Sequence, residues 1–252
     1  MKRLVAAFFS RAGASYCEAA RVQREAARDC VSAVPGGHHG VVVEIGTGQG
    51  MATAMLRASI SFERYVGLDI APGMLAAMTE RGPRELHVVA DGECPPLTEG
   101  CADLLVSSST MQWYRDPARS IPANLRLLRP GGAFSFSIFV EGTLSELAQA
   151  SRLSGFGDVV HLRSAQEYEW IVDGVPGVEC ESRLWEVRER YATVRDLLRT
   201  LKRSGVTGAG AGRAFSRRCY ENFETTYRRL HGDADGVAAT WRVLYLWGRR
   251  VA

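Results

Sequence analysis

The sequence predicts an α/β fold, a single domain in which a mostly parallel β-sheet carries helices on both faces. Apolar runs of strand length recur through the first 140 residues, helix-compatible segments separate them, and the first run ends in a cluster of glycines. Strands that alternate with helices form right-handed βαβ units, which build parallel sheets. With 252 residues, 46% of them hydrophobic, the chain can bury the core of one enlarged domain.

The first predicted elements surround a glycine-rich turn. Residues 15–34 carry apolar side chains at helical spacing and end at a Pro-Gly-Gly break, so they predict an amphipathic helix. The run VVVEIGTGQG at 41–50 is apolar and ends in glycines, which is typical of a buried parallel strand that enters a tight turn. A helix is expected to follow it over 51–58.

After residue 58, strands and helices are expected to alternate, and this alternation ends after residue 141. Further core strands are expected at 65–68, 86–89, 102–107 and 133–140, the last preceded by LLRPGG (127–132), which predicts the end of a helix. After residue 141 we expect helices at 143–154, 164–173 and 193–204, and strands near 178–190 and 238–248.

Composition excludes several classes of protein. No run of 18 apolar residues exists, so no membrane-spanning helix is expected. The apolar stretch that follows Lys2 and Arg3 is too short for the core of a signal peptide. The six cysteines form no CxxC pair and no metal or disulfide pattern. We therefore expect a cytoplasmic protein with free thiols.

The charge of the chain is unevenly distributed. Residues 183–252 hold 15 Arg and Lys against 7 Asp and Glu, whereas residues 1–182 hold 16 against 21. A basic surface attracts an acidic partner, which could be nucleic acid, a membrane face or an acidic carrier protein. The alternative, an arginine-rich helical face that is simply solvated, stays open from charge alone.

The glycines after the first strand point to a ligand. Gly46, Gly48 and Gly50 let the backbone turn sharply and approach a bound molecule where side chains would clash. In open α/β sheets such a ligand sits at the carboxyl ends of the strands. The spacing GxGxG departs from the dinucleotide fingerprint, which argues against a dehydrogenase.

Acids follow the strands in an order that suits adenosine. Glu44 precedes the glycines, and Asp69 closes the run YVGLD, where an acid can accept both ribose hydroxyls. Asp91 and Gly92 follow the third strand, where a carboxylate and a free backbone amide suit the exocyclic amine and a ring nitrogen of adenine. Together these positions predict a site for an adenosine ligand.

The motifs EIGTGQG, GLDIAPGML, ADGECPPL and LRPGG resemble the successive motifs of class I S-adenosylmethionine methyltransferases. The resemblance implies a Rossmann-like fold with a seven-stranded sheet and an added helical cover, with S-adenosylmethionine as methyl donor, S-adenosylhomocysteine as product, and no metal. Residues 41–140 would form the cofactor-binding core, and about 141–175 and 191–232 the cover and the substrate- and carrier-binding elements. The implied cofactor-binding residues are Gln23, Glu44, Gly46, Gly48, Asp69, Ile70, Met74, Asp91, Gly92 and Ser107.

Segments outside those motifs narrow the resemblance. FSRAGASY (9–16), SSSTMQW (107–113), GTLSEL (142–147), LKRSGVTG (201–208) and WRVLYLWGR (241–249) are similar to malonyl-acyl carrier protein methyltransferases of biotin synthesis. The likeness implies methylation of the free carboxylate of a malonyl thioester, on acyl carrier protein or coenzyme A, for pimeloyl and biotin synthesis. Departures from the family pattern fall at Cys17, Ser108 and His161.

The same likeness suggests residues for the acceptor and its carrier. An ionised carboxylate needs no general base, so the expected catalytic residues align the reactants, and they are Tyr16, Gln112 and Trp113. His161 and Arg163 are the candidates for binding the malonyl group. The acidic carrier protein would dock transiently on the basic C-terminal part, at one of two groups, Arg199, Lys202 and Arg203, or Arg217 and Arg218.

Two alternatives remain at this point. The same fold could methylate another small molecule, such as a quinone precursor or a natural product, because such enzymes share every cofactor motif. A noncatalytic adenosine-binding protein or scaffold, or an RNA-binding module that uses the basic region, is the other class. The sequence contains no recognisable RNA-binding motif, so we expect no nucleic-acid partner, and we expect no membrane partner either. We expect one domain over 1–252.

Overall fold

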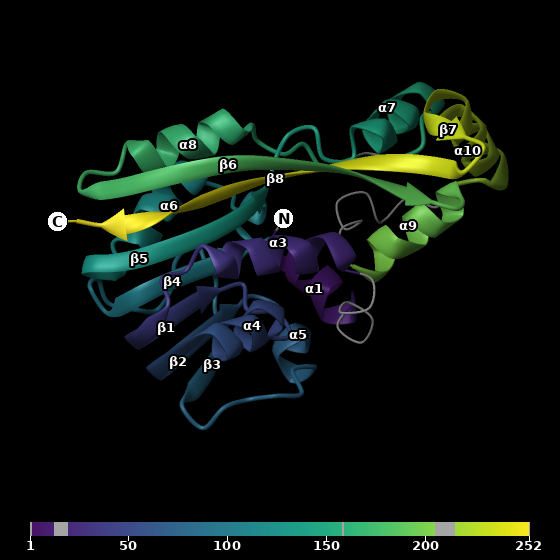
Figure 1. The fold of residues 1–252 in the computed structure, drawn as a ribbon. Coiled ribbons are helices and arrows are strands. Elements are labelled where there is room, and N and C mark those ends of the chain that lie inside the picture. Colours follow the sequence, from purple (N-terminus) through teal and green to yellow (C-terminus); the bar gives the residue numbers. More distant parts are fainter. Residues whose placement is uncertain (1, 13–19, 158, 205–214, 252) are drawn as a thin grey trace.

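The computed structural model describes residues 2–12, 20–157, 159–204 and 215–251 (Figure 1). The helix expected at 15–34 is present as α3 (Arg21–Ser32), and the predicted site residue Tyr16 lies outside the described part. An additional helix, α1 (Lys2–Ala12), occupies the N-terminal stretch that the sequence analysis considered only as a signal peptide.

One mixed sheet runs through the molecule in the order β3-β2-β1-β4-β5-β8-β6. The first five of these strands are parallel, and β8 is antiparallel to both of its neighbours. The predicted mostly parallel sheet of seven strands is confirmed, with a two-residue eighth strand, β7, paired to β8. The strands are β1 (Gly37–Ile45), β2 (Ile60–Asp69), β3 (Glu85–Val89), β4 (Ala102–Ser108), β5 (Leu128–Phe139), β6 (Val178–Tyr191), β7 (Gly232–Asp233) and β8 (Gly236–Arg250).

Strand β5 begins earlier than the apolar pattern predicts. Leu128 pairs with Ala102 of β4, after which the register shifts so that Leu104 faces Ala133. Gly131 sits inside the irregular stretch at φ +82°, a conformation that glycine adopts without strain. The segment LRPGG therefore belongs to the strand and does not end a helix, because pairing with β4 overrides its turn-like composition.

Helices cover both faces of the parallel strands, as predicted. Val42 and Leu104 face α3 and α4, whereas Val43 and Leu105 face α6 and α8, so successive strand residues point to opposite layers. Both sets are fully buried, which explains the continuous apolar runs in the sequence. The helices around the sheet are α4 (Met51–Ser59), α5 (Pro72–Ala76), η2 (Met111–Trp113), α6 (Pro117–Leu125) and α8 (Ala165–Asp173).

A second apolar core lies where β6 and β8 extend past the other strands (Figure 1). The helices α7 (Ser145–Ser154), α9 (Val194–Arg203) and α10 (Arg217–His231) pack there. Leu147, Leu201 and Phe223, one from each helix, meet Trp241 of β8 in this core. Helices α7, α9 and α10 thus form a cover beyond the parallel strands, whereas α8, which lies in the stretch 141–175 expected to join the cover, packs with α6 against the sheet.

The N-terminal helix α1 packs against α5, the short helix after β2. The Gly73 N–H donates a hydrogen bond to Ser10 Oγ (3.2 Å), and a side chain at Gly73 would collide with the backbone of Ser10. This contact holds α1 at the edge of the sheet where β2 ends. No helix of the described residues is long and apolar enough to cross a membrane.

Candidate active site

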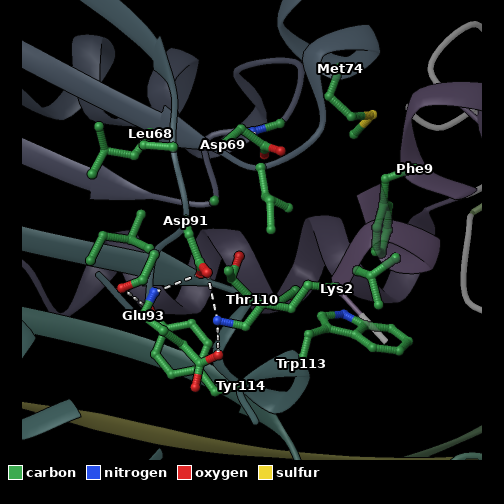
Figure 2. A pocket seen from close by; sticks show the side chains of 18 of the residues that line it. Lys2, Phe9, Leu68, Asp69, Met74, Asp91, Glu93, Thr110, Trp113 and Tyr114 are labelled. Carbon is green, nitrogen blue, oxygen red and sulfur yellow. Dashed lines mark hydrogen bonds and ion pairs between the residues drawn. The ribbon is translucent and has the colours of Figure 1, made fainter. Parts of the chain in front are cut away.

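A cavity opens at the carboxyl ends of β1, β2, β3 and β4, with α1 along one side (Figure 2). It encloses about 730 Å³ together with its open mouth. Open α/β sheets bind their ligands at this edge. Eight of the predicted site residues line it, namely Gly46, Gly48, Asp69, Ile70, Met74, Asp91, Gly92 and Trp113.

The glycine turn after β1 brings backbone to the cavity wall. Gly46 and Gly48 have φ of +81° and +56°, in the left-handed region that other residues rarely adopt. A Cβ on Gly46 would also overlap the side chain of Thr110 from the loop after β4. The Gly46 N–H donates to the Leu68 carbonyl (2.7 Å), which fixes the turn beside the end of β2. Glycine is therefore required here by both conformation and space.

Asp69 joins the turn to the end of β2. Its Oδ2 accepts the Gly48 N–H (2.8 Å) and its Oδ1 accepts the Ala71 N–H (2.7 Å). Burial raises the pKa of Asp69, and the two backbone N–H bonds act against that rise. A carboxylate oxygen has two lone pairs, so each oxygen can accept one further bond from a ligand in the cavity.

Asp91 follows β3, the strand paired with β2, and also lines the cavity. Its Oδ1 accepts the Glu93 N–H (3.0 Å), and its Oδ2 accepts a bond from Lys2 Nζ of α1 (2.5 Å), which also contacts the Glu93 carboxylate (Figure 2). Next to Asp91, a Cβ on Gly92 would lie 2.5 Å from Ile45 and 2.8 Å from the Tyr114 hydroxyl. A side chain at Gly92 would therefore collide with two residues that also line the cavity, so glycine is needed here for packing.

Tyr114 and Asn124 support the segment at Gly92. The Tyr114 hydroxyl lies 2.9 Å from the Gly92 carbonyl and 2.9 Å from Asn124 Oδ1, and Asn124 Nδ2 donates to the same carbonyl (2.9 Å). Burial raises the pKa of Tyr114, so its hydroxyl stays protonated at neutral pH. No pattern in the sequence predicted a role for these two residues, because their roles depend on contacts across the fold.

The loop after β4 is strained and incompletely hydrogen-bonded. Ser109 has φ +56°, and the Gln112 amide donates to its carbonyl (2.7 Å). Ser109 Oγ, Gln112 Oε1 and Trp113 Nε1 are buried without a hydrogen-bond partner among the described residues. Left-handed non-glycine residues and unpaired buried polar atoms both concentrate at functional sites. The loop therefore has the features expected of an acceptor-binding segment.

Two aromatic side chains close the cavity beside this loop. Phe9 of α1 packs edge-on against Trp113, with ring centroids 5.7 Å apart and planes at 81°. Val5, one helical turn before Phe9, also lines the cavity. The wall opposite the two acids is therefore apolar, and it is provided by a helix that sequence patterning did not reveal.

Glu44 lies beneath the glycine turn and does not line the cavity. Its Oε2 accepts the Tyr65 hydroxyl and the Thr53 hydroxyl (2.9 Å from Thr53). Thr47 of the turn contacts both hydroxyls at 3.0 Å. Burial raises the pKa of Glu44 to about 7, although the two hydroxyl bonds act to lower it. Glu44 thus supports the turn from below.

The other predicted residues take different positions. Gln23 and Ser107 are buried but do not line the cavity, and Ser107 Oγ donates to the Ile45 carbonyl (2.9 Å). Gln112 does not line it either. His161 and Arg163 are exposed, and Arg163 Nη1 pairs with Glu167 Oε1 at 3.1 Å. Arg163 thus forms a surface ion pair with a residue of α8, and the role of these two residues at the acceptor stays a prediction.

The described residues contain no cluster of His, Cys, Asp or Glu that could hold a metal ion. Lys2 is the one basic side chain among the described residues that line the cavity, and two carboxylates already pair with it.

The parallel sheet, the glycine turn and the acids after β2 and β3 define the methyltransferase class. The family model described as methyltransferase domain matches residues 43–136. Among solved structures, the fold is similar to geranyl diphosphate C-methyltransferase from Streptomyces coelicolor A3(2), in complex with Mg²⁺, geranyl diphosphate and S-adenosyl-L-homocysteine. That likeness has a TM-score of 0.53 and 15% identity, and it covers 91% of this chain and 79% of that one.

Curated relatives extend the likeness over nearly the whole chain. The malonyl-[acyl-carrier protein] O-methyltransferase of Methylococcus capsulatus is 32% identical over 96% of this chain and 92% of its own. The protein of the same name from Chlorobium phaeovibrioides is 33% identical over 99% and 96%. The chain belongs to the malonyl-[acyl-carrier protein] O-methyltransferase family.

Proposed function

We propose that the protein transfers the methyl group of S-adenosylmethionine to the free carboxylate of a malonyl thioester carried on acyl carrier protein. The observation that carries the proposal is the likeness to relatives of that name over both the core and the helical cover. The cover is the part that differs between methyltransferases that share one cofactor core. The product would be the malonyl methyl ester and S-adenosylhomocysteine, and biotin synthesis is the pathway that the family resemblance implies.

The cavity has the donors and acceptors that an adenosyl group needs. The free lone pairs of Asp69 can accept both ribose hydroxyls, and Asp91 can accept the exocyclic amine of adenine. Gly92 lines the cavity beside Asp91, where the adenine would lie. Gly46 and Gly48 would border the methionine part, and Met74 would pack nearby, because its methyl lies 3.3 Å from a Cβ built on Gly48.

The chemistry places few demands on the protein. When bound, S-adenosylmethionine supplies an electrophilic methyl group on a sulfonium centre. The malonyl carboxylate is ionised at pH 7, because such groups have a pKa of about 4, so no side chain has to remove a proton. The chain contributes alignment by the loop after β4 and exclusion of water by Val5, Phe9 and Trp113. Trp113 would position the acceptor, and Gln112 would act through its bond to Ser109.

We place the carrier on helix α9. Val194, Leu197 and Leu201 are buried, and the opposite face presents a row of exposed basic residues at helical spacing. The row consists of Arg195, Arg199 and Lys202. Acyl carrier proteins are acidic, and opposite charge speeds the encounter without requiring a tight complex.

Charge reversal tests this docking surface. Arg195→Glu combined with Lys202→Glu should raise KM for malonyl-acyl carrier protein by about tenfold, with a weaker effect at high salt. Turnover of malonyl-coenzyme A, which has no protein part, should not change. Arg64→Glu combined with Arg119→Glu, two exposed positions outside α9, reverses the same number of charges and is the matched control. An equal loss with both acceptors, or no loss with either, would remove α9 from the proposal.

The proposed reaction itself is tested by supplying labelled S-adenosylmethionine with one acceptor at a time. Label should enter malonyl-acyl carrier protein and not acetyl-acyl carrier protein, which lacks the free carboxylate. A panel of phenols tests the alternative small-molecule acceptors. Transfer to a phenol and none to the malonyl carrier would overturn the proposed acceptor and keep the methyltransferase.

A further inference from the structure

An ammonium group occupies the end of the cavity where the adenine amine would bind. Lys2 Nζ lies between the carboxylates of Asp91 and Glu93 (Figure 2). Asp91 Oδ1 already accepts the Glu93 N–H, and Lys2 takes Oδ2. Both oxygens of Asp91 thus have one partner before any ligand arrives, and an amine that took the remaining lone pair of Oδ2 would lie against the positively charged ammonium.

We propose that Lys2 competes with the adenine amino group for Asp91, so that the Lys2–Asp91 ion pair is a latch that opens when the cofactor binds, while helix α1 stays in place. The inference rests on the proposed function only in that the ligand is an adenosyl compound. Lys2 then lowers the affinity for the cofactor, whereas the glycine turn and the ribose acid raise it.

Glu93 can hold the Lys2 ammonium when the adenine amine binds Asp91. The Glu93 side chain is 7% exposed, and its Oε1 accepts the Asp116 N–H (2.7 Å), so the carboxylate is fixed without help from Lys2. Burial alone would raise the pKa of Glu93, but the bonds from Lys2 and from backbone N–H groups lower it below its ordinary value. The ammonium can therefore pass from two carboxylates to one, and α1 stays attached.

The remaining contacts of α1 allow such a shift. The Phe9–Trp113 contact is apolar, and the buried Trp113 N–H has no partner among the described residues. The Gly73 N–H bond to Ser10 lies two helical turns from Lys2. Movement of the Lys2 side chain therefore breaks its ion pair with Asp91 and leaves the α1–α5 contact in place.

The size of the effect follows from exposure. The side chains of Lys2 and Asp91 are 34% and 35% exposed, so their pairing is partly screened by solvent. Pairs of this kind change an equilibrium by about two- to fivefold. Removing the competitor by Lys2→Gln should therefore tighten binding of S-adenosylhomocysteine by about two- to fivefold, measured by calorimetry.

Three comparisons isolate Lys2. Arg3→Gln removes the same charge from an exposed neighbouring position and should leave the affinity unchanged. Added salt should tighten binding to the wild type, because it weakens the competing pair, and should not do so in Lys2→Gln. In an Asp91→Asn background, where the ion pair is absent, Lys2→Gln should bring no gain.

The outcomes separate the two proposals. Equal or weaker binding by Lys2→Gln would overturn the latch, because Lys2 would then be neutral toward the cofactor or contribute to holding it. A wild-type protein that binds no S-adenosylhomocysteine would overturn the proposed function, and the latch with it. That failure is visible before any variant is made.

Discussion

Replacing Glu44 by Gln exchanges a buried carboxyl for a neutral group of nearly the same shape. Gln can still accept the hydroxyls of Tyr65 and Thr53 at the position of Oε2, and its amide stands in for the protonated oxygen. Burial raises the pKa of Glu44 from its ordinary 4.5 to about 7 in the folded protein. The folded state therefore binds this proton more tightly than the unfolded chain does.

The sign and size of the effect follow from that difference. The stabilising contribution of the protonated carboxyl is fully present below pH 4.5 and is lost as the pH rises through 7. One pH unit is worth about 1.4 kcal/mol, so the full loss is about 3 kcal/mol. Gln has no proton to lose, so the free energy of unfolding of Glu44→Gln should gain about 3 kcal/mol on the wild type between pH 4.5 and 8.

Urea unfolding, followed by circular dichroism at several pH values, measures this difference. Subtracting the wild-type free energy of unfolding from that of the variant at each pH cancels the contribution of the other titrating groups. Glu99→Gln, at a surface carboxyl whose side chain is 68% exposed, is the matched control and should show little dependence on pH. A Glu44→Gln difference that stays flat or falls with pH would refute the buried, proton-binding carboxyl beneath the glycine turn.

Three further substitutions test other parts of the structure. Gly46→Ala should abolish S-adenosylhomocysteine binding and lower the free energy of unfolding by about 1–2 kcal/mol, because residue 46 has a positive φ and a Cβ there overlaps Thr110. The control is Gly100→Ala, which has open space around the new Cβ and should cost only backbone strain. Calorimetry and urea unfolding would show this, and equal effects would contradict it. Asp69→Ala should weaken calorimetric binding by at least about a hundredfold, through two charge-assisted hydrogen bonds, and lower stability by about 1–3 kcal/mol through two unpaired N–H groups. Unchanged affinity would remove it from the site. Phe223→Ala should cost about 3–5 kcal/mol in urea unfolding, and a loss below 1 would contradict a packed cover.

The parts of the fold that could be predicted are those written into short stretches of sequence. Val42 and Val43 are both apolar because both faces of β1 are covered, so this apolar run predicts a buried strand. The glycines and Asp69 follow such strands directly, and the carboxyl ends of parallel strands lie at one edge. Adjacency in the chain therefore implied adjacency in space, and the cavity confirms that these residues lie together.

The parts that could not be predicted depend on contacts between distant segments. Helix α1 is placed by α5, some 60 residues away in the chain, so nothing near Lys2 indicated a position beside Asp91. Tyr114 likewise acquires its role from Gly92. The role of Arg163 stays a prediction, because likeness in sequence made it a candidate for the acceptor and the structure shows it exposed and paired with its near neighbour Glu167.

A crystal structure of the protein with S-adenosylhomocysteine would show whether Asp69 and Asp91 hold the adenosyl group. We expect both ribose hydroxyls within hydrogen-bond distance of Asp69, the adenine amine on Asp91 Oδ2, and Lys2 paired with Glu93 alone. A ligand bound elsewhere, or one whose adenine lies away from Asp91 while Lys2 keeps both carboxylates, would refute this site.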